Sequence, residues 1–329
     1  MNGKKLKIEL KVTEDGLKLL SDINLTDFGI CNGDVCLLTI DDETGEAKFQ
    51  KICDALIDEI EKQDEKVMNI IFEESSALPA QIQSSTIPKS GVTLISLLAA
   101  INSLKLSIFE ICKSRDIYSL NVLYRSFLEH FIKINYFFYR LLTDKTDIVG
   151  EDYYKFYSQN EIAMYGKSLE QLRLIVDLEY RGKDIAEILY EIDPELKKYS
   201  SKELKGKILQ YNYKNMIKFI FDKQNSTIKD VDFSIILSII PEYAELSSFV
   251  HGGPYAIDST AKSWNNNEIE MKCCQFARST FSIYIISNLL LIVLYTRFLD
   301  KNYSLFYNKI NDVWKEASEK IEEYFEPFK

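Results

Sequence analysis

The sequence predicts a mostly α-helical protein, a helical bundle that follows a short N-terminal region containing strands. The 329 residues include only 12 Gly and 6 Pro, too few for a turn-rich all-β fold. After about residue 45, apolar residues recur at spacings of three and four, the period of an amphipathic helix. Two long apolar segments joined by a short polar turn predict an αα-hairpin, the usual start of a bundle.

The N-terminal region differs from the rest of the chain. Residues 5–12 alternate polar and apolar side chains, which is typical of a half-buried strand. Residues 34–40 form a second candidate strand, which ends at the polar run 41–45. We therefore predict a small strand-containing region over residues 1–44 and an α-helical bundle domain over residues 45–329.

The central hairpin is predicted from residues 92–112 and 117–142, with Ser114-Arg115-Asp116 as the turn between them. The same periodicity predicts further helices at about 151–176, 183–191, 201–222, 232–249, 268–299 and 303–325. Pro194 and Gly252-Gly253-Pro254 separate some of these segments.

One segment is apolar enough to consider as a membrane span. Residues 279–296 carry no charge over 18 positions, which reaches the lower length limit for a spanning helix. Several Ser, Thr and Asn residues, the flanking Arg278 and Arg297, and the lack of a second such segment favour a buried core helix and no membrane contact. A membrane-anchored protein is the alternative.

Composition restricts the function classes. The net charge is −10, and an acidic surface repels phosphate backbones. This disfavours bulk non-specific binding of nucleic acid but still allows binding at a local basic patch. Six Cys without CxxC spacing indicate reduced thiols rather than a disulfide framework or a zinc site. No secretory signal follows Met1. These features predict a cytoplasmic protein.

The chain contains only two histidines, His130 and His251, and the first lies in a chemically suggestive setting. His130 follows Arg125 by five positions in the predicted helix 117–142, so the two side chains are about 140° apart around the helix. Arg offers a planar fork that matches phosphate oxygens, and neutral imidazole accepts a proton from a hydroxyl. The pair suits RNA cleavage in which the 2′-OH attacks the adjacent phosphorus.

Arg-x4-His inside a long helix of a helical protein resembles the HEPN superfamily, whose motif is Arg-x4–6-His. The resemblance implies a bundle that forms a homodimer across the motif helices, with two Arg/His pairs in one cleft. It also implies a metal-independent endoribonuclease of toxin–antitoxin or antiviral defence systems, with Arg125 and His130 catalytic and no cofactor. The expected partners are RNA, such as tRNA, and an antitoxin or another defence protein. Two positions depart from family patterns: Ser126 follows the Arg, and Ile132 replaces the Tyr of one toxin subfamily.

The same residues also allow a purely structural interpretation. Arg125 and Glu129 are four positions apart and can form an ion pair on the helix surface. His130 can then bond to Ser126 one turn earlier. In that case the protein is a non-catalytic helical module that binds nucleotides, RNA or another protein.

The second histidine lies at the end of the predicted helix 232–249. His251 follows Ser247 by four positions, and Gly252 or Gly253 is expected to terminate the helix. His251 can simply interact with the free carbonyls at this helix end. Alternatively, Ser247 and His251 fold back beside Arg125 and His130 as additional site residues.

A local basic segment interrupts the acidic chain. Between Glu195 and Lys223 there are eight Lys and only three acidic residues, with Tyr side chains interspersed. Positive charge with aromatic stacking surfaces is typical of single-stranded RNA binding, although a solvated helix face has the same composition. The candidate RNA-binding residues are Lys197, Lys198, Lys202, Lys205, Lys207, Tyr211 and Tyr213.

Overall fold

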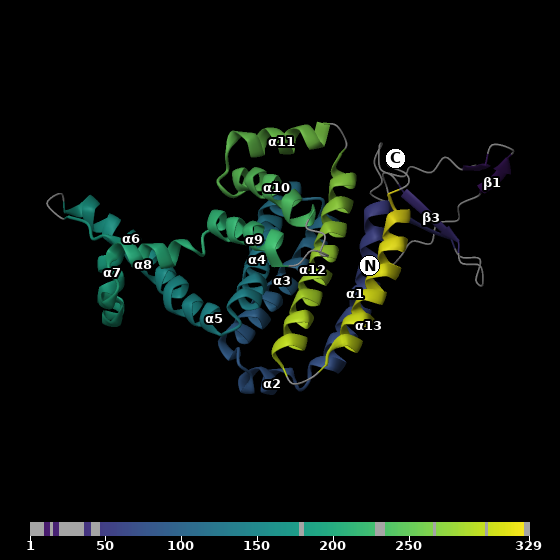
Figure 1. Ribbon diagram of the computed structural model, residues 1–329. Helices are drawn as coiled ribbons and strands as arrows, with labels where there is room; N and C mark the ends of the chain where they lie inside the picture. Colours follow the sequence, from purple (N-terminus) through teal and green to yellow (C-terminus); the bar gives the residue numbers. More distant parts are fainter. Residues whose placement is uncertain are drawn as a thin grey trace. The chain divides into compact units, whose positions relative to one another are not determined.

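A computed structural model describes residues 10–13, 16–19, 36–40, 47–177, 181–227, 234–265, 268–299 and 302–325. The chain divides into two compact units, Met1–Ile52 and Cys53–Lys329. The second unit is a bundle of helices, which confirms the predicted fold class (Figure 1).

The first unit contains two antiparallel hairpins. Strand β1 (Leu10–Thr13) pairs with β2 (Gly16–Leu19), with Leu10 opposite Leu19. Strand β3 (Cys36–Ile40) pairs with β4 (Ala47–Lys51). Of the predicted strand 5–12, residues 5–9 lie outside the described residues.

Strand β4 lies where the sequence analysis placed the start of the bundle. Residues 47–51 alternate apolar and polar side chains, the period of a strand, and they pair with β3. Helix α1 (Ile52–Ser75) begins directly after the strand. The strand-containing unit therefore extends beyond residue 44.

Three long helices form the core of the second unit. Helices α3 (Pro88–Ser114), α4 (Ile117–Asp144) and α12 (Ile269–Phe298) pack against one another (Figure 1). The predicted turn is confirmed: Arg115 adopts a left-handed conformation with φ 59° and ends α3. The Asp116 side chain then accepts a hydrogen bond from the Ser119 amide and caps α4.

Both α3 and α12 are long and apolar enough to cross a membrane, so the sequence analysis was wrong to count a single such segment. Within the most apolar 18 residues of each helix, 67% are buried in α12 and 39% in α3. Packing of α12 against α3, α4 and the C-terminal helix accounts for its apolar composition.

Helix α1 lies beside α13 (Ser304–Glu323) in Figure 1, and ion pairs join the two. Lys66 contacts Glu316 at 2.9 Å, and Lys309 contacts Glu74 at 2.8 Å. The short helix α2 (Leu78–Ser84) connects α1 to α3.

Helices α9 (Tyr213–Thr227) and α10 (Ser234–Val250) pack on α4, and α11 (Pro254–Asn265) follows them. Helix α10 ends in a Schellman motif at the predicted position. Gly252 has φ 63°, its amide donates to the Phe249 carbonyl at 3.3 Å, and the Gly253 amide donates to the Ser248 carbonyl at 3.0 Å.

The segment between α4 and α9 builds a smaller core of its own. Its elements are α5 (Ile148–Asp152), η2 (Tyr153–Ser158), α6 (Gln159–Val176), α7 (Ile185–Ile192), η3 (Pro194–Lys198) and α8 (Ser201–Leu209). Phe156, Ala163, Leu189, Leu196 and Leu204 are the centre of this core. The predicted helix 201–222 is in fact two helices, because the Asn212 side chain accepts from the Asn215 amide and starts α9 afresh.

Candidate functional site

The guanidinium of Arg125 is held between α4 and α10. Its Nε donates to Ser247 Oγ at 3.2 Å, and one terminal nitrogen donates to the Tyr243 hydroxyl at 2.9 Å. The guanidinium carbon also lies 4.7 Å from the centre of the Tyr243 ring. Its side chain remains 20% exposed, so the fixed cation is open to solvent.

An acidic residue separates Arg125 from a second cation on the same helix face. Glu129 lies 3.7 Å from Arg125 and 3.5 Å from Lys133, each one turn away. Lys133 in turn donates to the Tyr157 hydroxyl at 3.1 Å. The predicted Arg125–Glu129 ion pair is therefore present, and Lys133 extends it to a row of three alternating charges along α4.

His130 is half-buried and bonds to its own helix. Its Nδ1 lies 2.8 Å from the backbone carbonyl oxygen of Ser126, so Nδ1 carries the proton as the donor. In neutral imidazole this leaves Nε2 as the proton acceptor. The bond to Ser126 is the one the sequence analysis expected, and Ser126 contributes its carbonyl rather than its hydroxyl.

Tyr243 links Arg125 to another tyrosine. Its ring stacks on Tyr213 of α9, with ring centres 3.9 Å apart and planes 8° from parallel. Burial, and then the Glu129 carboxylate, raise the pKa of Tyr243, while Arg125 opposes them. Burial also raises the pKa of Tyr213 to about 12, so both rings are neutral phenols.

Beside Tyr243, α10 carries an acid that titrates near neutral pH. Burial, reinforced by the charge of Glu245, raises the pKa of Glu242 to about 7. Burial, and then the charge of Glu242, raise the pKa of Tyr124 in the core.

Of the two candidates at the end of α10, the structure brings only Ser247 to Arg125. The His251 side chain is exposed and has no hydrogen bond or ion pair within the described part of the chain. Only its backbone amide is engaged, donating to the Ser247 carbonyl at 3.3 Å. The proposed proximity of His251 to Arg125 and His130 is not among the contacts that the structure shows.

The candidate RNA-binding residues separate into two groups. Tyr213 reaches the Arg125 site through Tyr243, but Tyr211 is buried and donates to the Val149 carbonyl at 3.3 Å. A buried ring has no face free for a base, so the prediction for Tyr211 is wrong.

The five lysines of this set lie on η3 and α8, around the smaller core. Lys197 and Lys202 are exposed, but Lys205 pairs with Asp184 at 2.7 Å. Lys198 lies over the Tyr199 ring, and Lys207 lies over the rings of Phe156 and Tyr199. Partners within the fold thus hold three of the five lysines.

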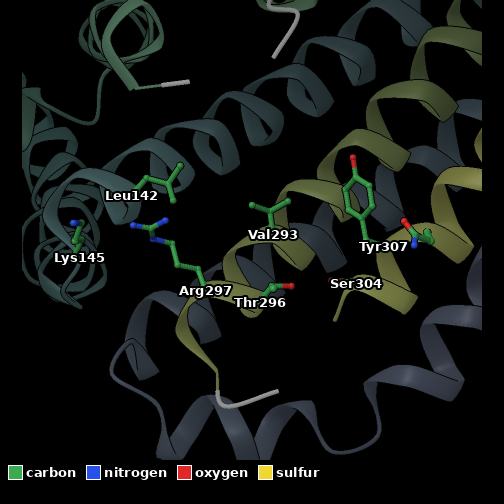
Figure 2. Close-up of a pocket in the computed structure, with 8 residues that line it drawn as sticks. Leu142, Lys145, Val293, Thr296, Arg297, Ser304 and Tyr307 are labelled. Carbon is green, nitrogen blue, oxygen red and sulfur yellow. The ribbon is translucent and has the colours of Figure 1, made fainter. Parts of the chain in front are cut away.

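A pocket of about 850 Å³ opens elsewhere in the bundle (Figure 2). It is lined by Leu142, Lys145, Val293, Thr296, Arg297, Ser304, Tyr307 and Asn308. Figure 2 shows Arg297 extending toward Leu142 of α4. Lys145 and Arg297 lie at the C-terminal ends of α4 and α12, where cations stabilise the helix dipole. Arg125 is twenty residues from Lys145, about 30 Å along α4, so the pocket is separate from the Arg125 site.

No group of three or more His, Cys, Asp or Glu side chains within the described ranges is arranged to hold a metal ion. Cys53, Cys112, Cys273 and Cys274 are buried free thiols. The Arg125 site itself brings together a guanidinium, a carboxylate, hydroxyls and aromatic rings, and the imidazole of His130 lies five positions along α4 from Arg125.

Sequence reasoning missed Tyr243, Lys133 and Tyr157. A local signal existed for Lys133, because it continues the four-residue spacing of Arg125 and Glu129. Tyr243 and Ser247 also share one face of a helix by the same spacing. Nothing in the sequence, however, places that face against Arg125, more than a hundred residues earlier.

The fold and the site define a mostly α-helical protein with a charged and aromatic surface site between α4 and α10. Residues 92–269 match the family of unknown function DUF5677, and the chain belongs to this family. The match runs from α3 to the beginning of α12 and includes every residue of the site. No curated protein and no solved structure matches the chain.

Proposed function

We propose that the protein is a metal-independent endoribonuclease with its active site at Arg125 and His130. The observation that supports this proposal is how the two side chains are hydrogen-bonded and exposed. Arg125 is a fixed, partly exposed cation, and His130 donates through Nδ1, which leaves Nε2 to accept a proton. The two residues lie five positions apart on α4, about 7.5 Å along the helix axis, a span that one phosphodiester and its ribose can bridge.

In the proposed reaction, His130 Nε2 takes the proton of a ribose 2′-OH, and the 2′-oxygen forms a bond to the adjacent phosphorus. The bond from phosphorus to the 5′-oxygen breaks, which yields a 2′,3′-cyclic phosphate. The leaving 5′-oxygen takes a proton from water or from a second imidazolium and becomes a 5′-hydroxyl. Arg125 stabilises the charge that develops on the phosphorane oxygens.

We also propose a biological role, which is the one that the resemblance to the HEPN superfamily implies. Two Arg/His pairs in a homodimer would supply both the base and the acid of the reaction. An RNase of this kind harms its own cell, so we place it in a toxin-like or antiphage defence role in the cytoplasm. An antitoxin or a defence partner would then restrain it until it acts on RNA such as tRNA.

Cleavage of a purified tRNA pool by the full-length protein tests the proposal. We expect cleavage in the presence of EDTA, reduced about 100-fold or more by Arg125→Ala and by His130→Ala. Arg278→Ala and His251→Ala are matched controls, since Arg278 pairs with Glu322 on the surface and the described structure shows no contact of the His251 side chain with a site residue. Both controls should cleave at the wild-type rate.

Folded Arg125→Ala and His130→Ala proteins that cleave as fast as wild type would contradict the assignment. Circular dichroism and thermal unfolding of each variant separate a catalytic loss from a folding loss.

A second candidate function is a non-catalytic helical module that binds RNA, nucleotides or another protein. The observation that favours it is that both key side chains already have partners inside the fold: Arg125 contacts Tyr243, Ser247 and Glu129, and His130 contacts Ser126. Binding of RNA without cleavage, weakened equally by Arg125→Ala and by Tyr243→Ala, would select this candidate.

A further inference from the structure

Helix α6 exposes an unusual amount of apolar surface. Eight of its 18 residues are large apolar side chains exposed to solvent in the described part of the chain: Ile162, Met164, Tyr165, Leu169, Leu172, Leu174, Ile175 and Val176. Soluble monomers seldom leave so many on a single helix, because each costs free energy in water.

Five of these side chains form a continuous line, which we call the α6 stripe: Ile162, Tyr165, Leu169, Leu172 and Val176. They are spaced three, four, three and four residues apart, the heptad spacing of a helix–helix seam. Their exposed fractions run from 46% at Leu169 to 88% at Val176.

The stripe faces away from the protein's own core. Ala163, on the opposite side of α6, is fully buried in the smaller core, and Gly166 approaches Ile188 of α7. Helical geometry places the centre of the stripe about 140° around the helix from Ala163. The two apolar faces of α6 therefore have different roles: one packs within the chain, and the other is open to a partner.

We propose that the stripe is a homodimer interface in which α6 pairs antiparallel with α6 of a second copy. An isologous interface requires a surface that complements itself, and a heptad seam does so, since residues of one heptad position fill spaces between those of the other. In this pairing Ile162 meets the partner's Leu172, and Tyr165 meets the partner's Leu169. The stripe contains no charge that a polar or ionic partner would recognise.

The area of the stripe fits this assignment. Five half-exposed or more exposed side chains offer on the order of 500 Å² of apolar surface on each copy. Two copies together would bury about 1,000 Å², the lower limit for a specific protein–protein interface. The flanking Ser168 is small and exposed, so it does not obstruct the approach of a second α6 helix. This pairing assigns the dimer to α6 instead of the motif helix α4 that the resemblance implies, and the Arg125 site lies on α4 and α10. The inference therefore does not depend on RNA cleavage.

Sedimentation velocity of the full-length protein at micromolar concentration tests the proposal. We expect a species of twice the 38.2 kDa chain mass for wild type and a monomer for the Leu169→Glu/Leu172→Glu variant. Leu305→Glu is the matched control, because Leu305 is 66% exposed on α13 and should leave the dimer intact. Both substituted leucines point to solvent in the monomer, so far-UV circular dichroism should be unchanged.

A photo-crosslinking residue in place of Tyr165 identifies what covers the stripe. The proposal requires crosslinked peptides that join α6 of one chain to α6 of another. It is overturned by a wild-type monomer at about 100 μM, a concentration far above the dissociation constant of a typical specific interface. It is also overturned by a dimer that persists in Leu169→Glu/Leu172→Glu, or by crosslinks from position 165 to the chain's own residues 1–52.

Discussion

At the scale of single residues, the Arg125 guanidinium joins α4 to α10 through contacts of different kinds. Ser247 and Tyr243 accept its hydrogen bonds, the Tyr243 ring lies beneath it, and Glu129 balances its charge. Tyr243 carries two of these contacts and also stacks on Tyr213. It is therefore the residue whose loss should change the site most.

Two substitutions of Tyr243 separate its hydroxyl from its ring. Tyr243→Phe removes one hydrogen bond to Arg125 and should lower the free energy of unfolding by about 1 kcal/mol. Tyr243→Ala also removes the buried ring and the Tyr213 stack, and should cost about 3 to 5 kcal/mol. Urea unfolding measures both values, and equal losses in the two variants would show that the ring contributes nothing beyond its hydroxyl.

The contacts of the site that could be predicted are those between residues that are close together in the sequence. The contacts Arg125–Glu129 and His130–Ser126 were expected because helix geometry alone brings residues four apart together. The contacts of Arg125 with Tyr243 and Ser247 depend on how α10 packs on α4, and no local rule fixes that packing. The burial of Tyr211 has the same origin, since it depends on the rings of Tyr136, Tyr153 and Tyr157 around it.

At the scale of elements, helix α10 carries Tyr243 and Ser247, which contact Arg125, and also the partly buried acid Glu242. Glu242 precedes Tyr243, and burial raises its pKa from the usual 4.5 to about 7. The folded chain therefore holds this proton more tightly than the unfolded chain. Between about pH 4.5 and 7, ionisation of Glu242 lowers the stability of the folded state as pH rises.

Glu242→Gln should remove this pH dependence. From pH 5 to pH 8, wild type should lose about 1 to 2 kcal/mol more unfolding free energy than the variant, a figure reduced for the partial exposure of the side chain. Urea unfolding across this pH range measures the difference. Glu110→Gln is the control, because Glu110 is exposed on α3 and its substitution should leave the wild-type dependence in place. Parallel curves for wild type and Glu242→Gln would contradict the prediction.

Helices and strands could be predicted where the periodicity of apolar residues extends over many positions, and less well where it extends over few. The hairpin α3–α4 and helix α12 follow from apolar periodicity that continues over more than twenty residues. Strand β4 has only five residues. Its apolar residue Phe49 also fits the three-and-four spacing of the helix α1 that follows, so the sequence pattern does not separate the strand from the helix. The division between α8 and α9 depends on one capping side chain, Asn212, inside a segment whose apolar spacing is continuous.

At the scale of the whole molecule, a buried ion pair fastens α1 to the core. Lys105 of α3 is fully buried, and its Nζ lies 2.5 Å from both carboxylate oxygens of Asp64. Nζ also lies 3.8 Å from the centre of the Tyr284 ring of α12. Burial raises the pKa of Asp64 and lowers that of Lys105, and each partner opposes the shift of the other.

Removing one member of this pair should be far more harmful than removing both. Lys105→Met leaves Asp64 buried without its cation and should cost about 3 to 5 kcal/mol. The double variant Lys105→Met/Asp64→Leu should lie within about 1 kcal/mol of wild type, or be more stable, because no charge remains to be desolvated. Thermal and urea unfolding provide both values. A double variant as unstable as the single one would mean that the pair itself holds α1 in place.

The nature of the RNA ends tests the central claim most directly. Wild-type protein incubated with tRNA and EDTA should produce fragments with 2′,3′-cyclic phosphate and 5′-hydroxyl ends, identified by mass spectrometry, and His130→Ala should produce none. Fragments that end in 5′-phosphate, or the same cyclic ends at the same rate from folded Arg125→Ala and His130→Ala proteins, would contradict a site in which Arg125 stabilises the phosphorane and His130 accepts the 2′ proton.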